Sequence, residues 1–198
     1  MELCSGGSLF NLLYFSPIKL LLEQQVTTLK GVSDAVAYLH AMEVPIIHRD
    51  LKSLNILLKR TLRTSWQMPE VRLVDFGSAR MKGSAEWGSM TKKAGTLHWM
   101  APEVHSGEYD ETVDVYSFGI VMFEVLSRTV PFDGMQTGDI LPFILRGGAP
   151  DIEAIPQDVP SSLTDLMVAC WAAQPRQRPS FAEITAQLRF QKRPSGRE

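Results

Sequence analysis

The sequence predicts a mainly α-helical domain with a small β-hairpin region, and three patterns carry this prediction. Residues 21–40 place apolar side chains at helical spacing. Two short runs with strand-like composition, 55–58 and 71–75, flank a polar stretch. Three further stretches after residue 112 have the patterns of helices. The 198 residues, of which 44% are hydrophobic and 21% charged, have the composition of one globular domain, which excludes disorder and collagen.

The first long helix is predicted at residues 21–40. Its apolar side chains stand three or four positions apart, at Leu22, Val26, Leu29, Val32, Val36 and Leu39. This spacing puts them in one stripe, which predicts a helix packed against the core. The helix is expected to end before Pro45, because the residue before a proline is disfavoured in the helical conformation.

The remaining elements follow in chain order. The runs 55–58 and 71–75 are predicted strands, joined by a long hairpin loop at 59–70. Helices are predicted at 112–127, 161–171 and 180–190, each with a serine or threonine near an acidic residue at its start, the residue types that cap helices. We expect one domain over residues 1–190, and a charged, disordered tail at 191–198.

Charge, hydropathy and cysteine content exclude several classes of protein. The formal net charge of −2 gives no basic surface for nucleic acid, so no nucleic-acid partner is expected. No apolar run approaches the roughly 18 residues that cross a bilayer, so no membrane association is expected. The only cysteines, Cys4 and Cys170, lack metal-ligand spacing and stand far apart, which favours the cytoplasm or the nucleus over an oxidising compartment.

Two short segments carry the residue types of a phosphate and metal site. The first, 48–55, reads His-Arg-Asp-Leu-Lys-Ser-Leu-Asn, and the second, 75–77, reads Asp-Phe-Gly. The carboxylate of Asp50, the ammonium group of Lys52 and the amide of Asn55 can converge from one loop. Asp75, at the end of the next predicted strand, can add a hard oxygen ligand for a metal ion.

These segments resemble the H-R-D-L-x-x-x-N and D-F-G motifs of eukaryotic protein kinases. Three more segments are similar to kinase motifs in the same order: 95–103 to the end of the activation segment, 114–119 to the start of the central buried helix, and 170–179 to the closing motif. The resemblance covers nearly the whole chain. It implies a kinase-like large C-terminal lobe, with residues 1–190 forming the hinge and that lobe.

The resemblance also implies roles for the motif residues. Asp50 would accept the proton of the substrate hydroxyl, and Lys52 would bind the γ-phosphoryl group as it transfers. Asn55 and Asp75 would hold Mg²⁺ against the phosphates of ATP, so ATP and Mg²⁺ are the implied cofactors.

Residues 1–9 are similar to the kinase hinge and the residues after it. The resemblance implies that backbone groups near Glu2 and Cys4 bind adenine, that Ser8 lies near the ribose, and that Leu57 forms the floor of the adenine pocket.

Other residues have structural roles in the family that this chain resembles. His48 and Phe76 are expected to stack and so to hold the Asp75 segment. Glu103 and Arg178 are expected to form a buried ion pair, and Asp114 is expected to anchor the backbone of the turn at residues 48–49.

The kinase class is indicated by a mixture of signals. Lys52 and the Gly95-Thr96 pair resemble serine/threonine kinases, whereas the Trp99–Glu103 segment is also shared with tyrosine kinases. This mixture resembles the tyrosine-kinase-like group, which mostly phosphorylates serine and threonine.

Because the resemblance starts at the hinge, we expect the ATP-clamping small N-terminal lobe to be absent from this chain. The chain is then a fragment or a truncated form. Its expected partners are protein substrates and a separate or upstream-encoded small lobe, and the activity of the chain alone stays open. The alternative is a catalytically inactive kinase lobe that serves as a binding or scaffold module.

Overall fold

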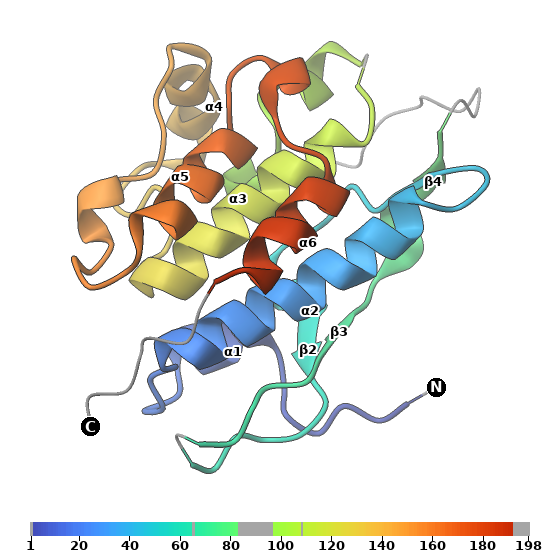
Figure 1. The fold of residues 1–198 in the computed structure, drawn as a ribbon. Helices are drawn as coiled ribbons and strands as arrows, with labels where there is room; N and C mark the ends of the chain where they lie inside the picture. Colours follow the sequence, from blue (N-terminus) through green and yellow to red (C-terminus); the bar gives the residue numbers. More distant parts are fainter. Residues whose placement is uncertain (1, 65, 83–96, 108, 192–198) are drawn as a thin grey trace.

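A computed structural model describes residues 2–64, 66–82, 97–107 and 109–191, apart from the side chain of Ser106. Gly95, Thr96 and nearly all of the tail predicted to be disordered lie outside these residues. The α-helices are α1 (Leu9–Tyr14), α2 (Leu22–His40), α3 (Thr112–Ser127), α4 (Thr137–Leu145), α5 (Ser161–Cys170) and α6 (Phe181–Arg189). The strands are β1 (Ile46–Ile47), β2 (Ile56–Leu58), β3 (Val71–Leu73) and β4 (Arg80–Met81). The predicted class, mainly helical with a small β region, is confirmed (Figure 1).

Helix α3 forms the centre of the molecule and is buried on every side from Val113 to Leu126. Its sequence is apolar around its whole circumference, which is the pattern of a helix enclosed by other elements. Helices α2 and α5 both pack against it. Gly119 permits the close approach of α5, because a Cβ atom there would lie 2.9 Å from the Cβ atom of Cys170.

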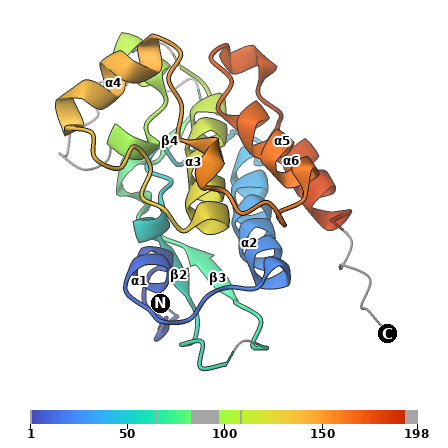
Figure 2. The same ribbon diagram turned by 90° about the vertical axis from the view of Figure 1, so that its left-hand side faces the viewer.

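Strands β2 and β3 lie beside α1 and α2, at one end of the helical layer, and β4 lies apart from them (Figure 2). Strands β2 and β3 pair antiparallel, with Ile56 opposite Leu73 and Leu58 opposite Val71, so the predicted hairpin is confirmed. Its long loop is held against α2, where the side-chain amide of Gln24 donates to the carbonyl of Gln67 at 2.7 Å. Strand β1 pairs antiparallel with β4.

Several details differ from the sequence-based predictions. Helices α1 and α4 and the β1–β4 pair were not predicted. The expected serine or threonine caps are wrong for two helices, because Glu111 precedes α3 and Pro160 precedes α5, neither with a capping side-chain bond. Only α6 has the predicted cap, in which Ser180 and Glu183 bond reciprocally to each other's backbone.

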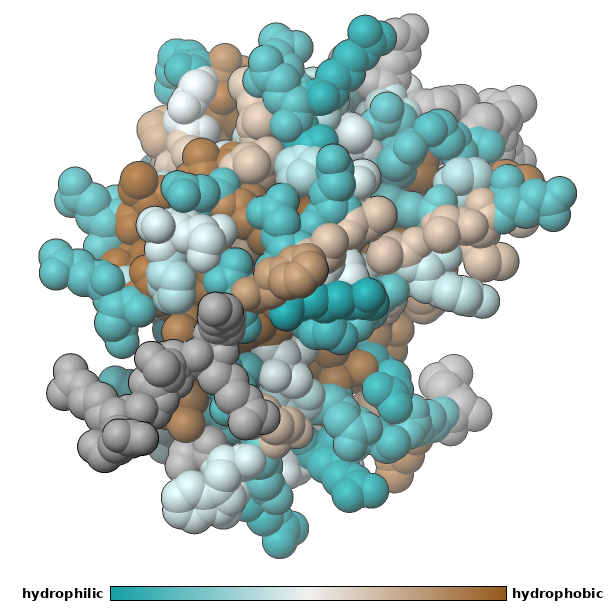
Figure 3. Space-filling view, in the orientation of Figure 1, coloured by the Kyte–Doolittle hydropathy of each residue, from teal (hydrophilic) through white to brown (hydrophobic). Residues whose placement is uncertain are grey.

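The surface mixes polar side chains with exposed apolar ones such as Phe15 and Phe190. Hydrophilic side chains dominate the face in Figure 3, with hydrophobic ones showing between them. Within the described part of the chain, no helix is both long and apolar enough to span a membrane. Cys4 and Cys170 are both free thiols.

Candidate active site

The site begins with the turn at residues 48–49, which a side chain of α3 holds in place. Asp114 is fully buried, and its carboxylate accepts the backbone N–H groups of His48 and Arg49, both at 2.8 Å. The ring of His40 lies 2.9 Å from the same carboxylate. These bonds hold Arg49 at a φ of 66°, in the left-handed region that side chains with a Cβ disfavour. The predicted anchoring contact of Asp114 is therefore present.

The buried ring of His48 connects this turn to the segment after β3. Its Nε2 atom lies 3.1 Å from the carbonyl of Val74, and its Nδ1 atom lies 3.4 Å from the backbone nitrogen of Asp50. Because a carbonyl only accepts and a backbone N–H only donates, these partners assign the hydrogen to Nε2. The ring also contacts that of Phe76 edge-on, 5.1 Å between centroids, as predicted.

Asp50, Lys52 and Asn55 converge as the sequence spacing predicts. Both carboxylate oxygens of Asp50 lie 2.8 Å from Nζ of Lys52. The amide nitrogen of Asn55 donates to the carboxylate of Asp50 at 3.0 Å and to its backbone carbonyl at 2.8 Å. The side chains of Asp50 and Lys52 are each 12% exposed, so they remain accessible at the surface. The arrangement places a proton acceptor and a cation side by side.

A backbone hydrogen bond places Asp75 next to Asp50, Lys52 and Asn55. The N–H of Val74 donates to the carbonyl of Asn55 at 3.0 Å, which places the residue after Val74 beside the loop. Asp75 has left-handed φ and ψ angles of 65° and 66°, and one of its carboxylate oxygens accepts the N–H of Gly77. The residue is exposed, so its carboxylate is open to a ligand.

Asn55 and Asp75 form a donor set that suits Mg²⁺. The amide nitrogen of Asn55 is directed to Asp50, which leaves its amide oxygen as the possible metal ligand. With the carboxylate of Asp75 this makes two hard oxygen ligands. Mg²⁺ is typically bound in this way, by one or two protein oxygens together with phosphates and water.

Residues 2–8 run along β2, near the same site. The N–H groups of Ser5 and Gly6 donate to carbonyls of Lys59 and Leu58, and Ser8 forms a β-bridge with Leu57. The backbone groups of Glu2 and Cys4 make no hydrogen bond to any residue that the structure describes. They are therefore open to a ligand, and their predicted contact with adenine stays a prediction.

In this segment the side chains of Glu2 and Ser8 contact other residues of the protein. The carboxylate of Glu2 forms ion pairs with Lys59 at 3.2 Å and with Arg72 at 2.8 Å. These hydrogen-bonded cations lower the pKa of Glu2. The hydroxyl of Ser8 accepts the N–H of Asn11 and so caps α1. This cap explains why α1 begins after Ser8, and it leaves the hydroxyl hydrogen for the predicted ribose contact.

A buried glutamate that sequence reasoning missed also contacts the loop. Glu124 on α3 is fully buried, and its carboxylate contacts Ser53, Trp99 and Tyr14. Burial raises the pKa of Glu124 from 4.5 to about 7, against the opposing effect of its hydrogen bonds. Its sequence signal is one acidic residue inside the apolar run 120–126, which is the pattern of a buried, partnered charge.

The predicted ion pair between Glu103 and Arg178 is present. The two guanidinium nitrogens lie 2.5 and 3.1 Å from the two carboxylate oxygens. The side chain of Arg178 is fully buried and that of Glu103 is 15% exposed. This bidentate pair joins the segment before α3 to the segment before α6.

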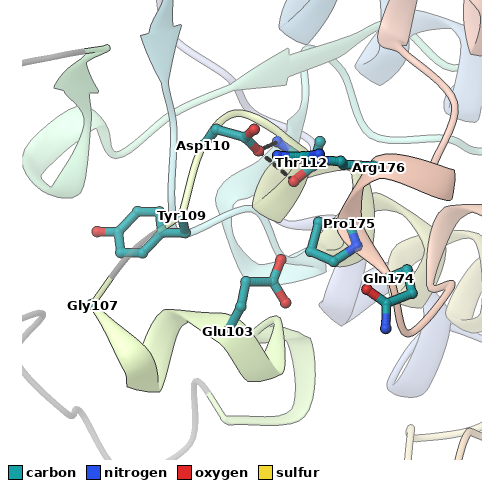
Figure 4. A pocket seen from close by; sticks show the side chains of 8 residues that line it. All are labelled: Glu103, Gly107, Tyr109, Asp110, Thr112, Gln174, Pro175 and Arg176. Atoms are coloured by element: carbon teal, nitrogen blue, oxygen red, sulfur yellow. Dashed lines mark hydrogen bonds between the residues drawn. The ribbon is translucent and has the colours of Figure 1, made fainter.

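A cavity of about 760 Å³ opens beside Glu103, and the residues around Asp50 do not line it (Figure 4). Asp110 and Arg176 lie on one side of it and Tyr109 on another. Its connection to the site is indirect, because the hydroxyl of Tyr109 accepts a hydrogen bond from the guanidinium of Arg49 at 2.8 Å.

The chain is similar in sequence to known proteins. Residues 1–188 match the family described as protein tyrosine and serine/threonine kinase. In Dictyostelium discoideum, a probable LIM domain-containing serine/threonine-protein kinase is 37% identical over 95% of the chain, and the RGS domain-containing serine/threonine-protein kinase A is 36% identical over 94%. Mitogen-activated protein kinase kinase kinase 7 of Drosophila melanogaster is 37% identical over 93%. The chain spans 18%, 15% and 26% of these three relatives.

Proposed function

We propose that this chain, which belongs to the protein tyrosine and serine/threonine kinase family, supplies the phosphoryl-transfer site of a serine/threonine protein kinase. The observation that carries the proposal is the convergence of Asp50, Lys52 and Asn55 beside the Asp75 segment. The names of the relatives support serine/threonine specificity. ATP and Mg²⁺, used generally in this family, are the proposed cosubstrate and cofactor.

The geometry suits the following division of roles. The carboxylate of Asp50 accepts the proton of a protein hydroxyl while the hydroxyl oxygen forms a bond to the γ-phosphorus and the bond to the β-phosphate oxygen breaks. General-base assistance of this kind contributes roughly 10²- to 10⁴-fold in rate. Lys52, 2.8 Å from Asp50, places positive charge where negative charge develops on the phosphoryl oxygens.

Asn55 and Asp75 would hold Mg²⁺, which neutralises charge on the phosphates when bound. Asn55 has a second role, because its amide nitrogen orients the carboxylate of Asp50. The open backbone groups of Glu2 and Cys4 would bind adenine, with Leu57 below it and Ser8 near the ribose.

We also propose that residues 1–190 correspond to the hinge and large lobe of the kinase fold, within the tyrosine-kinase-like group. The helical architecture around buried α3 and the strand-like course of residues 2–8 along β2 support the lobe assignment. The segments Leu51–Ser53 and Trp99–Glu103 support the group assignment. The proposed substrates are serine and threonine hydroxyls of proteins.

The test compares the full gene product that contains this chain with its Asp50→Asn variant. Transfer of the γ-phosphate from ATP and Mg²⁺ to myelin basic protein is measured for both, and ATP affinity is measured by calorimetry. We expect transfer that the substitution lowers at least 100-fold while ATP affinity stays within about threefold. Equal transfer by both proteins would refute the role of Asp50. ATP binding without transfer in either would favour the binding-module alternative.

A further inference from the structure

Three segments that are distant in the sequence meet at the carboxylate of Glu124. The hydroxyl of Ser53, in the loop that holds Asp50 and Lys52, donates to Oε1 at 2.7 Å. The hydroxyl of Tyr14, at the end of α1, lies 3.1 Å from the same oxygen. The indole N–H of Trp99 donates to Oε2 at 2.6 Å. One side chain on α3 therefore touches the catalytic loop, α1 and the segment before Glu103.

The hydrogen bonds at this junction favour a proton on Glu124 when the hydroxyl of Tyr14 donates to its other neighbour. The hydroxyl of Tyr14 lies 3.0 Å from the carbonyl of Thr129, which can only accept. If the phenolic hydrogen goes to that carbonyl, the contact between Tyr14 and Oε1 needs a hydrogen from the carboxyl group. Oε2 must accept from Trp99, so the proton belongs on Oε1. A neutral Glu124 then satisfies these four contacts, whereas an ionised one leaves Tyr14 with one hydrogen for two acceptors. The backbone N–H of Ser53 also interacts with the carboxyl group of Glu124.

The surroundings agree with a neutral carboxyl. Burial raises the pKa of Glu124 to about 7. Charged and titratable groups on the elements around it are directed elsewhere: Lys52 pairs with Asp50, and His98 lies against the ring of Trp99. Arg128 donates to the carbonyl of Leu13 in α1 and to that of Ser16 after it. Tyr14 itself titrates only at high pH, because burial raises its pKa further.

We propose that Glu124 is a positioning residue for phosphoryl transfer, and that by sharing a proton with Tyr14 it holds Ser53 in place. The proposal rests on the kinase activity proposed above. Ser53 directly follows Lys52 and lies two residues before Asn55, so a shift of its hydroxyl would move both neighbours of Asp50. Small displacements of positioned groups cost large factors in rate, because the reacting atoms must be aligned within a fraction of an ångström.

The first measurement replaces Ser53 by alanine, which removes the bond from its hydroxyl to Glu124 and keeps the interaction of its backbone N–H. Ser33→Ala is the matched control, since Ser33 is equally buried but its hydroxyl contacts α2 and α6, far from the loop in the fold. In the full gene product we expect Ser53→Ala to lower kcat about tenfold with KM for ATP within twofold. We expect Ser33→Ala to leave kcat within twofold. Unchanged kcat in a folded Ser53→Ala protein, or equal losses in both variants, would overturn the positioning role.

The second measurement reports the shared proton without using activity. The protein is labelled with 5-fluorotryptophan, and the ¹⁹F signal of Trp99, assigned with Trp99→Phe, is followed from pH 5.5 to 8.5. We expect the signal to titrate near neutral pH in the parent and to stay constant in Glu124→Gln, whose amide mimics the neutral carboxyl. A signal that does not titrate in the parent overturns the shared proton. A parent that shows this titration but no phosphate transfer refutes the proposed kinase activity, and the positioning role with it.

Discussion

Removal of Glu103 should destabilise the protein strongly, because it leaves the guanidinium of Arg178 buried without its carboxylate. Breaking a buried ion pair from one side costs about 3 to 5 kcal/mol. Arg178 keeps two backbone acceptors, the carbonyls of Ala172 at 2.9 Å and Thr112 at 3.1 Å, and it lies 5.1 Å from the ring centroid of Tyr116. These remaining contacts place Glu103→Ala near the lower limit, at about 3 kcal/mol.

Arg178→Ala should cost more, about 4 kcal/mol, because it also removes the donor to the carbonyl of Ala172 and one of the donors to that of Thr112. The double variant should cost less than the sum of the two single variants, since the residues interact directly. At about 2 to 4 °C per kcal/mol for a chain of this size, Glu103→Ala should lower Tm by about 6 to 12 °C.

Urea denaturation followed by circular dichroism measures these differences. The control is Lys30→Ala, which breaks an exposed pair with Asp34 whose side chains are 40% and 37% exposed. Exposed pairs contribute below about 1 kcal/mol, so this variant should resemble the parent. A decrease in the free energy of unfolding for Glu103→Ala that is as small as the decrease for Lys30→Ala would show that water solvates Arg178. That result would refute the reasoning.

Three further perturbations test the scaffold. Asp114→Asn turns an amide hydrogen toward a backbone N–H of the anchored turn, and it should lower the free energy of unfolding by about 2 kcal/mol, measured by urea midpoint, and lower kcat as well. Gly119→Ala puts a Cβ atom 2.9 Å from that of Cys170 and should cost about 1 to 3 kcal/mol; an unchanged midpoint would contradict the close helix contact. Because the folded-state pKa of Glu124 is about 7, against 4.5 for the free side chain, its protonation stabilises the fold at low pH. That contribution, about 3 to 4 kcal/mol at 1.4 kcal/mol per pKa unit, is lost between about pH 4.5 and 7. Unfolding of Glu124→Gln at a series of pH values should lack this loss.

Local patterns made the helix at residues 22–40 and the cluster of Asp50 with Asn55 predictable. A stripe at helical spacing and a separation of five residues are both contained in a few turns of chain, so distant contacts hardly alter them. Helix α4 was missed because Gly138 and Pro142 both oppose helix formation. Its buried Ile140 outweighs that propensity only in the folded chain.

The missed parts of the site depend on contacts that sequence spacing does not contain. Ser8 reads as a turn residue, and its hydroxyl becomes a helix cap only because α1 follows it. The bond from Trp99 to Glu124 spans 25 residues, and that from Ser53 spans 71. An acidic residue in an apolar helix predicts that some partner exists, but the identity of the partner is decided by packing.

The polar residues of α3 explain why the fold and the site depend on each other. Asp114, Ser117 and Glu124 are separated by three and seven residues, which places them on one face of a helix that is otherwise apolar. A buried polar group must find hydrogen-bond partners, and neighbouring helices have already satisfied their own backbone groups. Loops retain free N–H and C=O groups and carry polar side chains, so most partners of this face lie in loops. Asp114 accepts backbone N–H groups of the turn before Asp50, Ser117 donates to the carbonyl of Trp99 at 2.7 Å, and Glu124 accepts the hydroxyl of Ser53. The interactions that make α3 compatible with burial are therefore the same ones that hold the loop of residues 48–55 in position.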